Sequence, residues 1–338
     1  MTESERDLSR RAIPDQLFED DDFTWNVTAS GYRWANLHEL RGVRNFRGKT
    51  ERILTDVPPA GGRIEEGEDY KPLRVGGLFL TFADTPLTED GMRAFANRYG
   101  FLGGGDEVLA PWPAESGGGE GYLRDAESWE SWEVALTCMK VAVKLWRLVT
   151  NEDRRALEHL ISWRPTRAGR EIVIEHRNHV RTWHYHQFQT VAVPDGFRLP
   201  PNDVLGPARL FVQGWVNMRL WALTAPLLFW NADRDKQVMR IVPKTLLGAM
   251  WLQFARAVSG EVRYRPCKAC GKWLTLSTED DGFRSDREFC TAACRQKDYR
   301  AKVKAARQQR IEGRTMRQIA KHFNTTTDTI RNWLTKEK

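Results

Sequence analysis

Residues 265–274 read RPCKACGKWL and residues 289–295 read FCTAACR, and these two segments decide the fold of the C-terminal end of the chain. Their four cysteines follow the spacing C-x2-C-x19-C-x3-C, whereas the fifth cysteine, Cys138, stands alone. In a reducing compartment, two closely spaced cysteine pairs indicate metal ligands rather than disulfides. Four thiolates close a tetrahedral zinc site and leave no position for water. The sequence therefore predicts one structural Zn²⁺, bound by Cys267, Cys270, Cys290 and Cys294.

The residues around these cysteines fit the two halves of such a site. Gly271 directly follows the second cysteine, where a tight turn requires a residue that tolerates positive φ. Backbone N–H groups of such a turn point at the sulfurs and stabilise their charge. Cys290 and Cys294 are four residues apart, so we expect both thiolates on one face of a helix. Because four thiolates also hold iron–sulfur clusters, iron is the alternative to zinc.

Residues 264–304 resemble a treble-clef zinc finger of the CGNR type, through RPCKACGKWL and through the helix start in RSDREFCTAACRQKDYR. At the position of the CGNR motif itself, this chain has Cys294-Arg295-Gln296-Lys297. Residues 70–260 resemble uncharacterised bacterial proteins that carry such a finger near the C-terminus. The resemblance implies a knuckle, a hairpin and a helix around the metal, together with nucleic-acid binding and a regulatory role.

The positive charge of the chain is concentrated at the same end. Residues 261–338 contain 19 Lys or Arg and 10 Asp or Glu, a net charge of +9, although the whole chain carries only +7. The first 260 residues are close to neutral, at −2. This asymmetry predicts a polyanionic partner for the C-terminal end alone. DNA is the partner that we expect, and RNA is the alternative.

Residues 295–310 are expected to form a helix, with seven basic residues and one acidic residue. Tyr299, Val303 and Ala306 recur on this helix as a narrow apolar stripe, so the remaining surface is positive. Basic helices bind phosphates without reading the base sequence, and an ordinary solvated face is the alternative. We expect phosphate contacts from Arg295, Lys297, Arg300, Lys302, Lys304 and Arg307.

Residues 313–338 resemble a helix-turn-helix of the recombinase and homeodomain-like kind. Asn324 stands where the turn requires a left-handed residue, and Thr326 is placed to cap the second helix. Because two helices cannot bury a core, we expect the basic helix to supply the third. The positions expected to pack together are Ile319, Ala320, Phe323, Ile330, Trp333 and Leu334.

The recognition helix is expected over Thr326–Leu334. Its outward residues, which we expect to face the major groove, are Thr327, Asp328, Arg331 and Asn332. Arginine pairs with guanine and asparagine with adenine through two hydrogen bonds each, so these residue types suit base reading.

The pattern of the whole chain predicts an α+β fold. We expect a poorly ordered segment over 1–69, an α+β domain over 70–260, a treble-clef finger over 261–298 and a trihelical helix-turn-helix over 299–338. The elements expected in the larger domain are a strand at 74–82, helices at 88–99, 128–150, 151–163, 202–221 and 243–258, strands within 171–193, and a hairpin over 227–242. Trp129, Trp132 and Trp146 recur at helical spacing and are expected in its core.

The first 260 residues show no catalytic signature. The sequence contains no phosphate-binding Walker loop, GxSxG, HExxH or GxGxxG motif. His176, His179, His184 and His186 crowd one stretch, and we interpret them as structural or exposed histidines rather than as a metal site. Neither a signal peptide nor an apolar run long enough for a bilayer is found, so a cytoplasmic protein without membrane contact is expected.

The preferred hypothesis is a bacterial, sequence-specific DNA-binding regulator without enzymatic activity. Its larger domain would bind a small-molecule or protein effector, or form a homodimer. The first alternative is an enzyme or defence-type effector, with residues 70–260 as a catalytic domain that the C-terminal end delivers to nucleic acid. The second alternative is an RNA-binding or protein-interaction zinc module.

Overall fold

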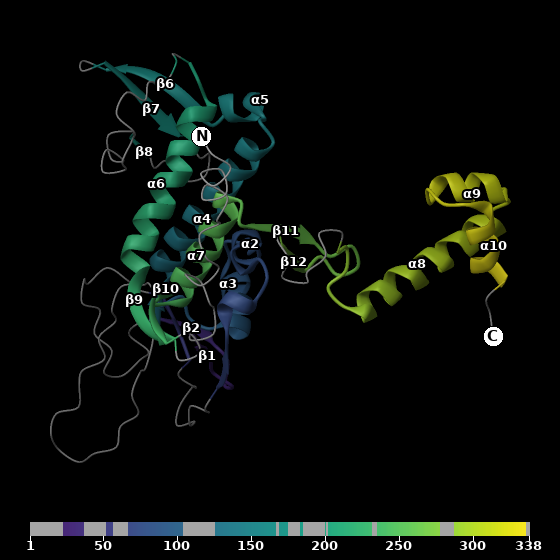
Figure 1. The fold of residues 1–338 in the computed structure, drawn as a ribbon, viewed down its shortest axis with the longest axis horizontal. Coiled ribbons are helices and arrows are strands. Elements are labelled where there is room, and N and C mark those ends of the chain that lie inside the picture. The colour runs from purple at the N-terminus through teal and green to yellow at the C-terminus, as the bar shows by residue number, and fades with distance from the viewer. Residues whose placement is uncertain are drawn as a thin grey trace. The chain divides into compact units, whose positions relative to one another are not determined.

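Helices and strands are both abundant, which confirms the α+β class (Figure 1). The computed structural model describes residues 23–36, 52–56, 67–103, 126–166, 169–174, 183–184, 200, 202–231, 235–277 and 287–335. The chain divides into two compact units, Met1–Ser259 and Gly260–Lys338. Each unit is described by itself.

The core of the first unit is a group of packed helices. α4 (Trp129–Thr150) packs against α2 (Leu78–Asp84) and α6 (Leu205–Leu223), and α7 (Leu246–Ser259) packs against α2 and α6. Trp132, Trp215 and Trp251 are among the largest fully buried side chains of this core. The predicted helix at 128–150 is confirmed, with Ser128 as its N-cap.

The strands of the first unit are short and antiparallel. β1 (Trp25–Val27) pairs with β4 (Glu68–Tyr70), and β3 (Arg52–Thr55) lies between β2 (Arg33–Asn36) and β5 (Ala126–Ser128). β6 (Ile161–Thr166), β7 (Gly169–Ile174) and β8 (Trp183–His184) form a second three-stranded sheet. β9 (Thr224–Asn231) and β10 (Lys236–Pro243) form the predicted hairpin.

The expectation of a poorly ordered start is wrong for three parts of residues 1–69, namely 23–36, 52–56 and 67–69. Ile53 and Leu54 on β3 are completely buried, and the indole N–H of Trp25 donates to the backbone carbonyl of Phe101 at 2.9 Å. Long-range pairing with β4 and β5 holds these strands, and a count of charged residues and glycines does not detect such pairing. The rest of the segment lies outside the described residues.

The strand predicted at 74–82 is wrong. A 3-10 turn at Pro72–Arg74 precedes α2, and Gly77 begins that helix with a φ of +63°. Almost every side chain of α2 is buried, so its apolar run shows no helical period and resembles a buried strand in the sequence. The sequence of this segment could not distinguish the two.

Two other helix predictions need correction. The helix predicted over 151–163 is reduced to the short α5 (Arg154–Glu158), and strand β6 begins soon afterwards, at Ile161. Pro243 was expected in the first turn of a helix but ends strand β10, and α7 begins at Leu246. Thr245 explains that later start, because its hydroxyl accepts the N–H of Gly248 as a capping side chain does.

The remaining predictions for this unit hold where they are described. α3 (Glu89–Tyr99) is capped by Thr88, and α6 begins after Asp203, whose carboxylate accepts the N–H groups of Leu205 and Gly206. β7 and β8 include part of the region where strands were predicted, 171–193, and the rest of that region lies outside the described residues.

The second unit consists of a hairpin followed by helices. β11 (Val262–Pro266) pairs with β12 (Trp273–Ser277), and α8 (Ala292–Ile311), α9 (Met316–His322) and α10 (Thr327–Thr335) follow. α8 is one continuous helix, so the boundary predicted between residues 298 and 299 falls inside it. The segments predicted as the finger and as the helix-turn-helix therefore share a helix.

Candidate metal centre and nucleic-acid interface

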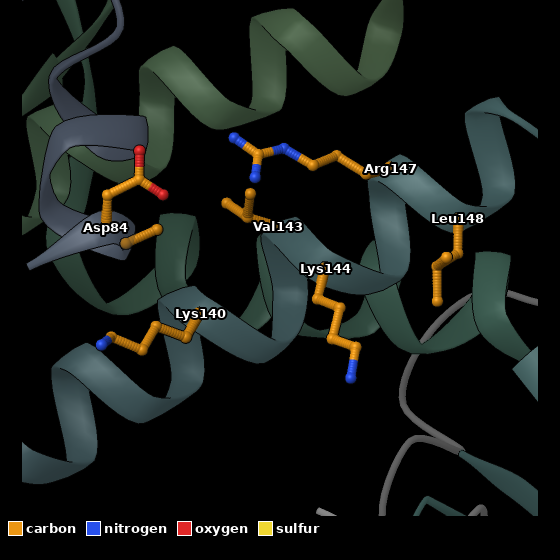
Figure 2. Close-up of a pocket in the computed structure, with 7 residues that line it drawn as sticks. Asp84, Lys140, Val143, Lys144, Arg147 and Leu148 are labelled. Atoms are coloured by element: carbon orange, nitrogen blue, oxygen red, sulfur yellow. The ribbon is translucent and has the colours of Figure 1, made fainter. Parts of the chain in front are cut away.

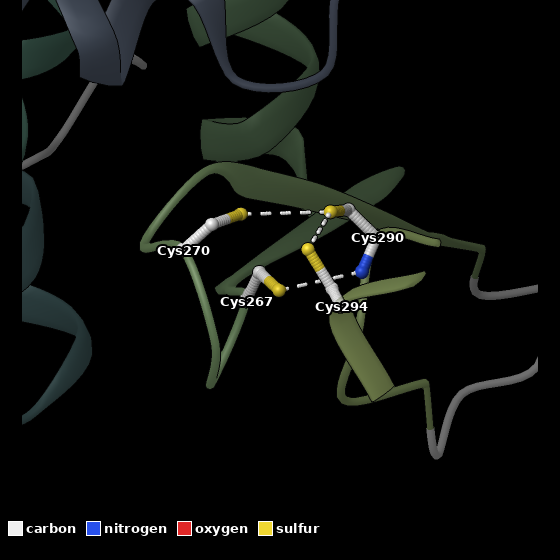
Figure 3. A group of neighbouring side chains, drawn as sticks. All are labelled: Cys267, Cys270, Cys290 and Cys294. Atoms are coloured by element: carbon white, nitrogen blue, oxygen red, sulfur yellow. Dashed lines mark hydrogen bonds between the residues drawn. The ribbon is translucent and has the colours of Figure 1, made fainter. Parts of the chain in front are cut away.

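The four clustered cysteines converge on one point (Figure 3). Cys267 and Cys270 lie in the turn between β11 and β12, whereas Cys290 and Cys294 lie at the start of α8. All four Sγ atoms are within 4.8 Å of one another. The Sγ atom of Cys290 is 3.5 Å from that of Cys270 and 3.3 Å from that of Cys294. A tetrahedral site with Zn–S bonds of about 2.3 Å needs sulfurs roughly 3.8 Å apart, so the cluster has the size of a metal site.

The first half of the site is a tight turn. The Cys267 N–H donates to the Lys272 carbonyl at 2.8 Å, and the Gly271 N–H donates to the Cys267 carbonyl at 2.9 Å. Gly271 has a φ of +72°, as the sequence predicted. No heavy atom lies within 4 Å of the position that a Cβ would occupy, so the turn requires glycine for its backbone conformation rather than for space.

The second half differs from the prediction in one respect. Cys294 is in the first turn of α8, but Cys290 lies before that helix, so the two thiols do not share a helix face. Thr291 stands between them as the N-cap, and its hydroxyl accepts the N–H of Cys294 at 3.1 Å. Because an N-cap residue has an extended backbone, Cys290 reaches the cluster from the chain that enters the helix.

The electrostatics of the cluster favour a bound cation. Burial raises the pKa of the Cys267 thiol, but hydrogen bonds from the backbone N–H groups of Cys290, Ala269 and Cys270 and from the Cys270 thiol outweigh burial and lower the pKa to about 6. The pKa of Cys290 is raised to about 12, first by burial and then by its hydrogen bonds to the other three thiols. Four thiolates this close therefore need a positive ion among them, which is the chemistry of a metal site with four cysteine ligands.

A charged pair that the sequence analysis missed joins the two halves of the site. The Lys268 N–H donates to the Glu288 carbonyl at 3.1 Å, and the Lys268 ammonium contacts the Glu288 carboxylate at 2.5 Å. The Arg287 side chain adds hydrogen bonds to the carbonyls of Phe289 and Cys290. The sequence did contain a signal for this pair. Lys268 is one residue from Cys267, and Glu288, which has the opposite charge, is two residues from Cys290.

The helix-turn-helix core contains the residues that the sequence placed there. Ala306, Ile319, Ala320 and Ile330 are buried together, and Met316, Phe323, Trp333 and Leu334 pack around them. The ring centroid of Trp333 lies 6.0 Å from that of Tyr299 and 5.6 Å from that of Phe323. α8 is therefore the third helix of this unit, as predicted. Asn324 has the expected left-handed backbone, with a φ of +48°.

The predicted phosphate-contacting residues differ in how accessible they are. Arg295, Lys297, Arg300 and Lys304 are exposed, whereas Lys302 and Arg307 are half-buried. Lys302 is also paired with Asp298, with 2.7 Å between its Nζ and a carboxylate oxygen. The spacing of Lys297, Arg300 and Lys304 puts them on one face of α8, opposite the buried Ala306. This exposed basic face is the part of α8 best suited to phosphates.

α10 presents polar side chains outward. The Thr326 hydroxyl caps the helix by accepting the N–H of Thr329 at 3.2 Å, as expected. Asp328, Arg331 and Asn332 are exposed, and Thr327 is half-buried. The Asp328 carboxylate lies 2.6 Å from the Arg331 guanidinium, one turn along the helix. The carboxylate therefore orients the arginine on the outer face of α10.

A small pocket in the first unit shows no catalytic arrangement (Figure 2). It has a volume of about 230 Å³, below the roughly 300–1,000 Å³ of common ligand sites. Its charged lining consists of Asp84 from α2 with Lys140, Lys144 and Arg147 from α4. Figure 2 shows Lys140 and Lys144 pointing away from each other, so their charges do not converge on one ligand. Burial lowers the pKa of Lys140, and the nearby Asp84 carboxylate opposes that shift.

The other candidate group, the histidines, cannot be placed. His176, His179 and His186 lie outside the described residues, and only the backbone of His184 is described, in β8. Among the described residues, three or more metal-ligating side chains come close together in the cysteine cluster alone. Among the same residues, no helix is both long enough and apolar enough to cross a bilayer.

Comparison of the chain with protein-family models, with curated proteins and with solved structures finds no significant match in any of the three. The functional proposal therefore rests on the geometry of the cysteine cluster and of the three C-terminal helices.

Proposed function

We propose that the chain is a sequence-specific DNA-binding regulator whose second unit holds one structural Zn²⁺ and binds DNA through α8 and α10. The observation that carries this proposal is the shared core of α8, α9 and α10. That core buries one side of each helix and leaves the basic face of α8 and the polar face of α10 exposed. A third helix behind a helix-turn-helix is what such DNA readers need in order to fold.

The donor set supports zinc as the metal. Four cysteine thiols with no open position suit a structural zinc ion. The knuckle at Cys267–Gly271, in the turn of the β11–β12 hairpin, with α8 after it, suits a treble-clef finger. When bound, the ion supplies cross-linking rather than chemistry. The chain's own residues then fix where α8 begins, because Cys294, Thr291 and the Lys268–Glu288 pair tie its first turn to the hairpin.

The exposed side chains divide into two classes of DNA contact. Arg300 and Lys304 lie on the exposed basic face of α8, outside the recognition helix, so we assign them to phosphates. Arg331 and Asn332 on α10 are of the types that read guanine and adenine in the major groove. Asp328 and Arg331 form an exposed ion pair on α10, which favours an Arg331 side chain that lies on the outer face of the helix.

Selection from random sequence tests this function. The purified full chain, loaded with zinc, is incubated in parallel with a random duplex DNA pool and a random RNA pool at fixed, stated salt concentration. We expect a short motif to be enriched from the DNA pool, because a helix in the major groove reads three or four adjacent base pairs. Enrichment from the RNA pool alone, or DNA binding without any motif, contradicts the proposal.

A further inference from the structure

The β9–β10 hairpin has one apolar face that is open to solvent. Leu228 is 67% exposed, Trp230 is 61% exposed and Met239 is 51% exposed. Leu228 and Trp230 are two residues apart on β9, and Met239 is the register partner of Leu228 on β10. Alternate residues of a strand and directly opposed residues of a pair lie on the same side of a sheet. These three side chains therefore form one surface, which we call the open hairpin face.

The other side of the hairpin is better covered. Phe229, Val238 and Arg240 belong to that side, and all three are half-buried. The Arg240 guanidinium lies over the Phe229 ring, 5.1 Å from its centroid. Among the large apolar side chains described on that side, Leu227 alone is strongly exposed. The hairpin thus has one half-covered face and one face with large apolar side chains in water, which costs free energy unless a partner covers them.

The size of the open hairpin face fits a protein interface. Leu228, Trp230 and Met239 together expose roughly 350 Å² if a large side chain offers about 150–250 Å² when fully exposed. A stable interface buries about 800 Å² on each partner, of which about 65% is apolar in homodimers. Three side chains therefore supply more than half of the apolar area that a dimer needs. Trp221, just before the hairpin at the end of α6, is 85% exposed and adds to the apolar surface of this region.

The chemistry of the face suits a second copy of the same chain. Its residues are all uncharged; they are Thr224, Pro226, Leu228, Trp230, Gln237, Met239, Ile241 and Pro243. In a two-fold dimer a surface meets its own copy, so any charge near the axis would face a like charge. An uncharged apolar face avoids that repulsion. In addition, β9 and β10 pair only with each other within the described residues, and a lone two-stranded sheet gains stability when a further layer packs on it.

We propose that the open hairpin face is a homodimer interface, in which the hairpins of two copies pack face to face. This interface belongs to the first unit and does not depend on the proposed DNA binding. If both proposals hold, the dimer carries two helix-turn-helix units and reads two half-sites. The mass of the protein in solution tests the interface without DNA, so its failure and a failure of DNA binding are separate results.

The test measures the molar mass of the protein in solution by light scattering on a size-exclusion column, over a series of protein concentrations. Wild type is compared with two variants that change the net charge by the same amount. Wild type is expected at twice the 39.1 kDa chain mass. Leu228→Glu puts two carboxylates into the interface and is expected at the mass of one chain. Lys236→Gln also lowers the charge by one on the same hairpin, but lies on the other face, and is expected to remain dimeric. Melting curves verify that both variants fold.

Two results overturn the proposal. One is a wild-type chain that has the mass of a monomer at every concentration, which means that another partner, or water alone, covers the face. The other is a dimer that Leu228→Glu leaves intact, which means that the copies meet elsewhere. If Leu228→Glu melts early or aggregates, Met239→Glu, the change at its register partner, replaces it and carries the same two expectations.

Discussion

Cys270 is the exposed member of the thiol cluster, whereas Cys267, in the same turn, is buried. Exposure does not make Cys270 dispensable, because its Sγ atom is 3.5 Å from that of Cys290 and closes one edge of the site. A site with three thiolates and one hydroxyl binds zinc more weakly, and in small modules metal binding and folding are coupled. At the scale of single residues, loss of one thiol is therefore expected to weaken both metal binding and the local fold.

We predict that wild type contains one zinc per chain and that Cys270→Ser loses most of it. Elemental analysis of the purified proteins measures the metal, and protease digestion reports whether the region around the turn opens. Cys138→Ser is the matched control, because Cys138 is buried in the first unit and is not a member of the cluster, so its loss is expected to leave the zinc in place. Iron in wild type, or no metal at all, rejects the zinc assignment.

Gln253 is a buried polar residue on which one segment of the first unit depends. Its side-chain oxygen accepts the Leu78 N–H at 3.0 Å, and its Nε2 donates to the carbonyls of Pro72, Leu73 and Val75. These bonds tie the chain before α2 to α7. The role of this residue was not visible in the sequence, because a single glutamine in an apolar helix has no periodic signal.

We predict that Gln253→Leu lowers the free energy of unfolding of the first unit by about 2–4 kcal/mol, because buried backbone groups lose their partners. Urea unfolding followed by tryptophan fluorescence measures the loss. Gln213→Leu is the control, since Gln213 is exposed on α6 and the same chemical change there should cost little. Equal effects of the two substitutions would show that the hydrogen bonds of Gln253 do not stabilise the fold.

At the scale of elements, the sequence predicted what depends on neighbouring residues and failed where distant contacts decide. The apolar spacing of α4 and of the three C-terminal helices gave the correct helix faces, and Gly271 and Asn324 marked turns because few residues tolerate positive φ. α2 was mistaken for a strand because burial on all sides removes the helical period. The strands at 23–36 and 52–56 were missed because their partners lie far away in the sequence.

In the candidate site too, the sequence predicted local features and missed those that depend on three-dimensional structure. The cysteine spacing predicted which four thiols come together, since the turn around Cys267 and Cys270 is a local structure. The position of Cys290 before α8 did not follow, because Thr291 between the two cysteines caps the helix and moves its start. The Lys302–Asp298 ion pair was not predicted either. Because of this pair, Lys302 is a poorer probe of the proposed phosphate contacts than the exposed Lys304.

We predict that Lys304→Ala weakens binding to all duplexes alike and flattens the plot of log affinity against log salt by roughly one unit of slope. The physical reason is the loss of one phosphate contact and of the counterion that it releases. Fluorescence anisotropy at several salt concentrations measures both quantities. Lys321→Ala on α9 serves as a control of equal charge that lies outside the basic face of α8. A slope that Lys304→Ala leaves unchanged would place DNA elsewhere.

At the scale of the whole molecule, the division between Ser259 and Gly260 separates a nearly neutral unit from a strongly basic one. The first unit buries its own core of helices, with Trp132, Trp215 and Trp251 among its buried side chains. Gly260 has a φ of +84° at the end of α7 and so ends that helix directly before the hairpin of the second unit. Each unit thus has buried apolar residues that cluster within it.

We predict that residues 1–259 expressed alone give a folded protein with a cooperative thermal transition. The reason is that the helices of this unit bury a core of their own. Calorimetry of the fragment and of the full chain compares the two transitions, and removing metal from the full chain with a chelator is expected to leave the transition of the first unit unchanged. A molten or aggregated fragment would show that the finger completes the core.

The measurement that tests base reading by α10 most directly is a titration of wild type, Arg331→Ala and Arg317→Ala against a selected duplex and its scrambled version, at several salt concentrations. We predict that Arg331→Ala reduces the difference in binding free energy between the two duplexes by ~1–3 kcal/mol, because a bidentate contact to one guanine is lost. Arg317→Ala on α9 removes the same charge and should leave that difference unchanged. If Arg331→Ala weakens both duplexes equally and preserves the difference, α10 does not read the bases and the proposed function is wrong.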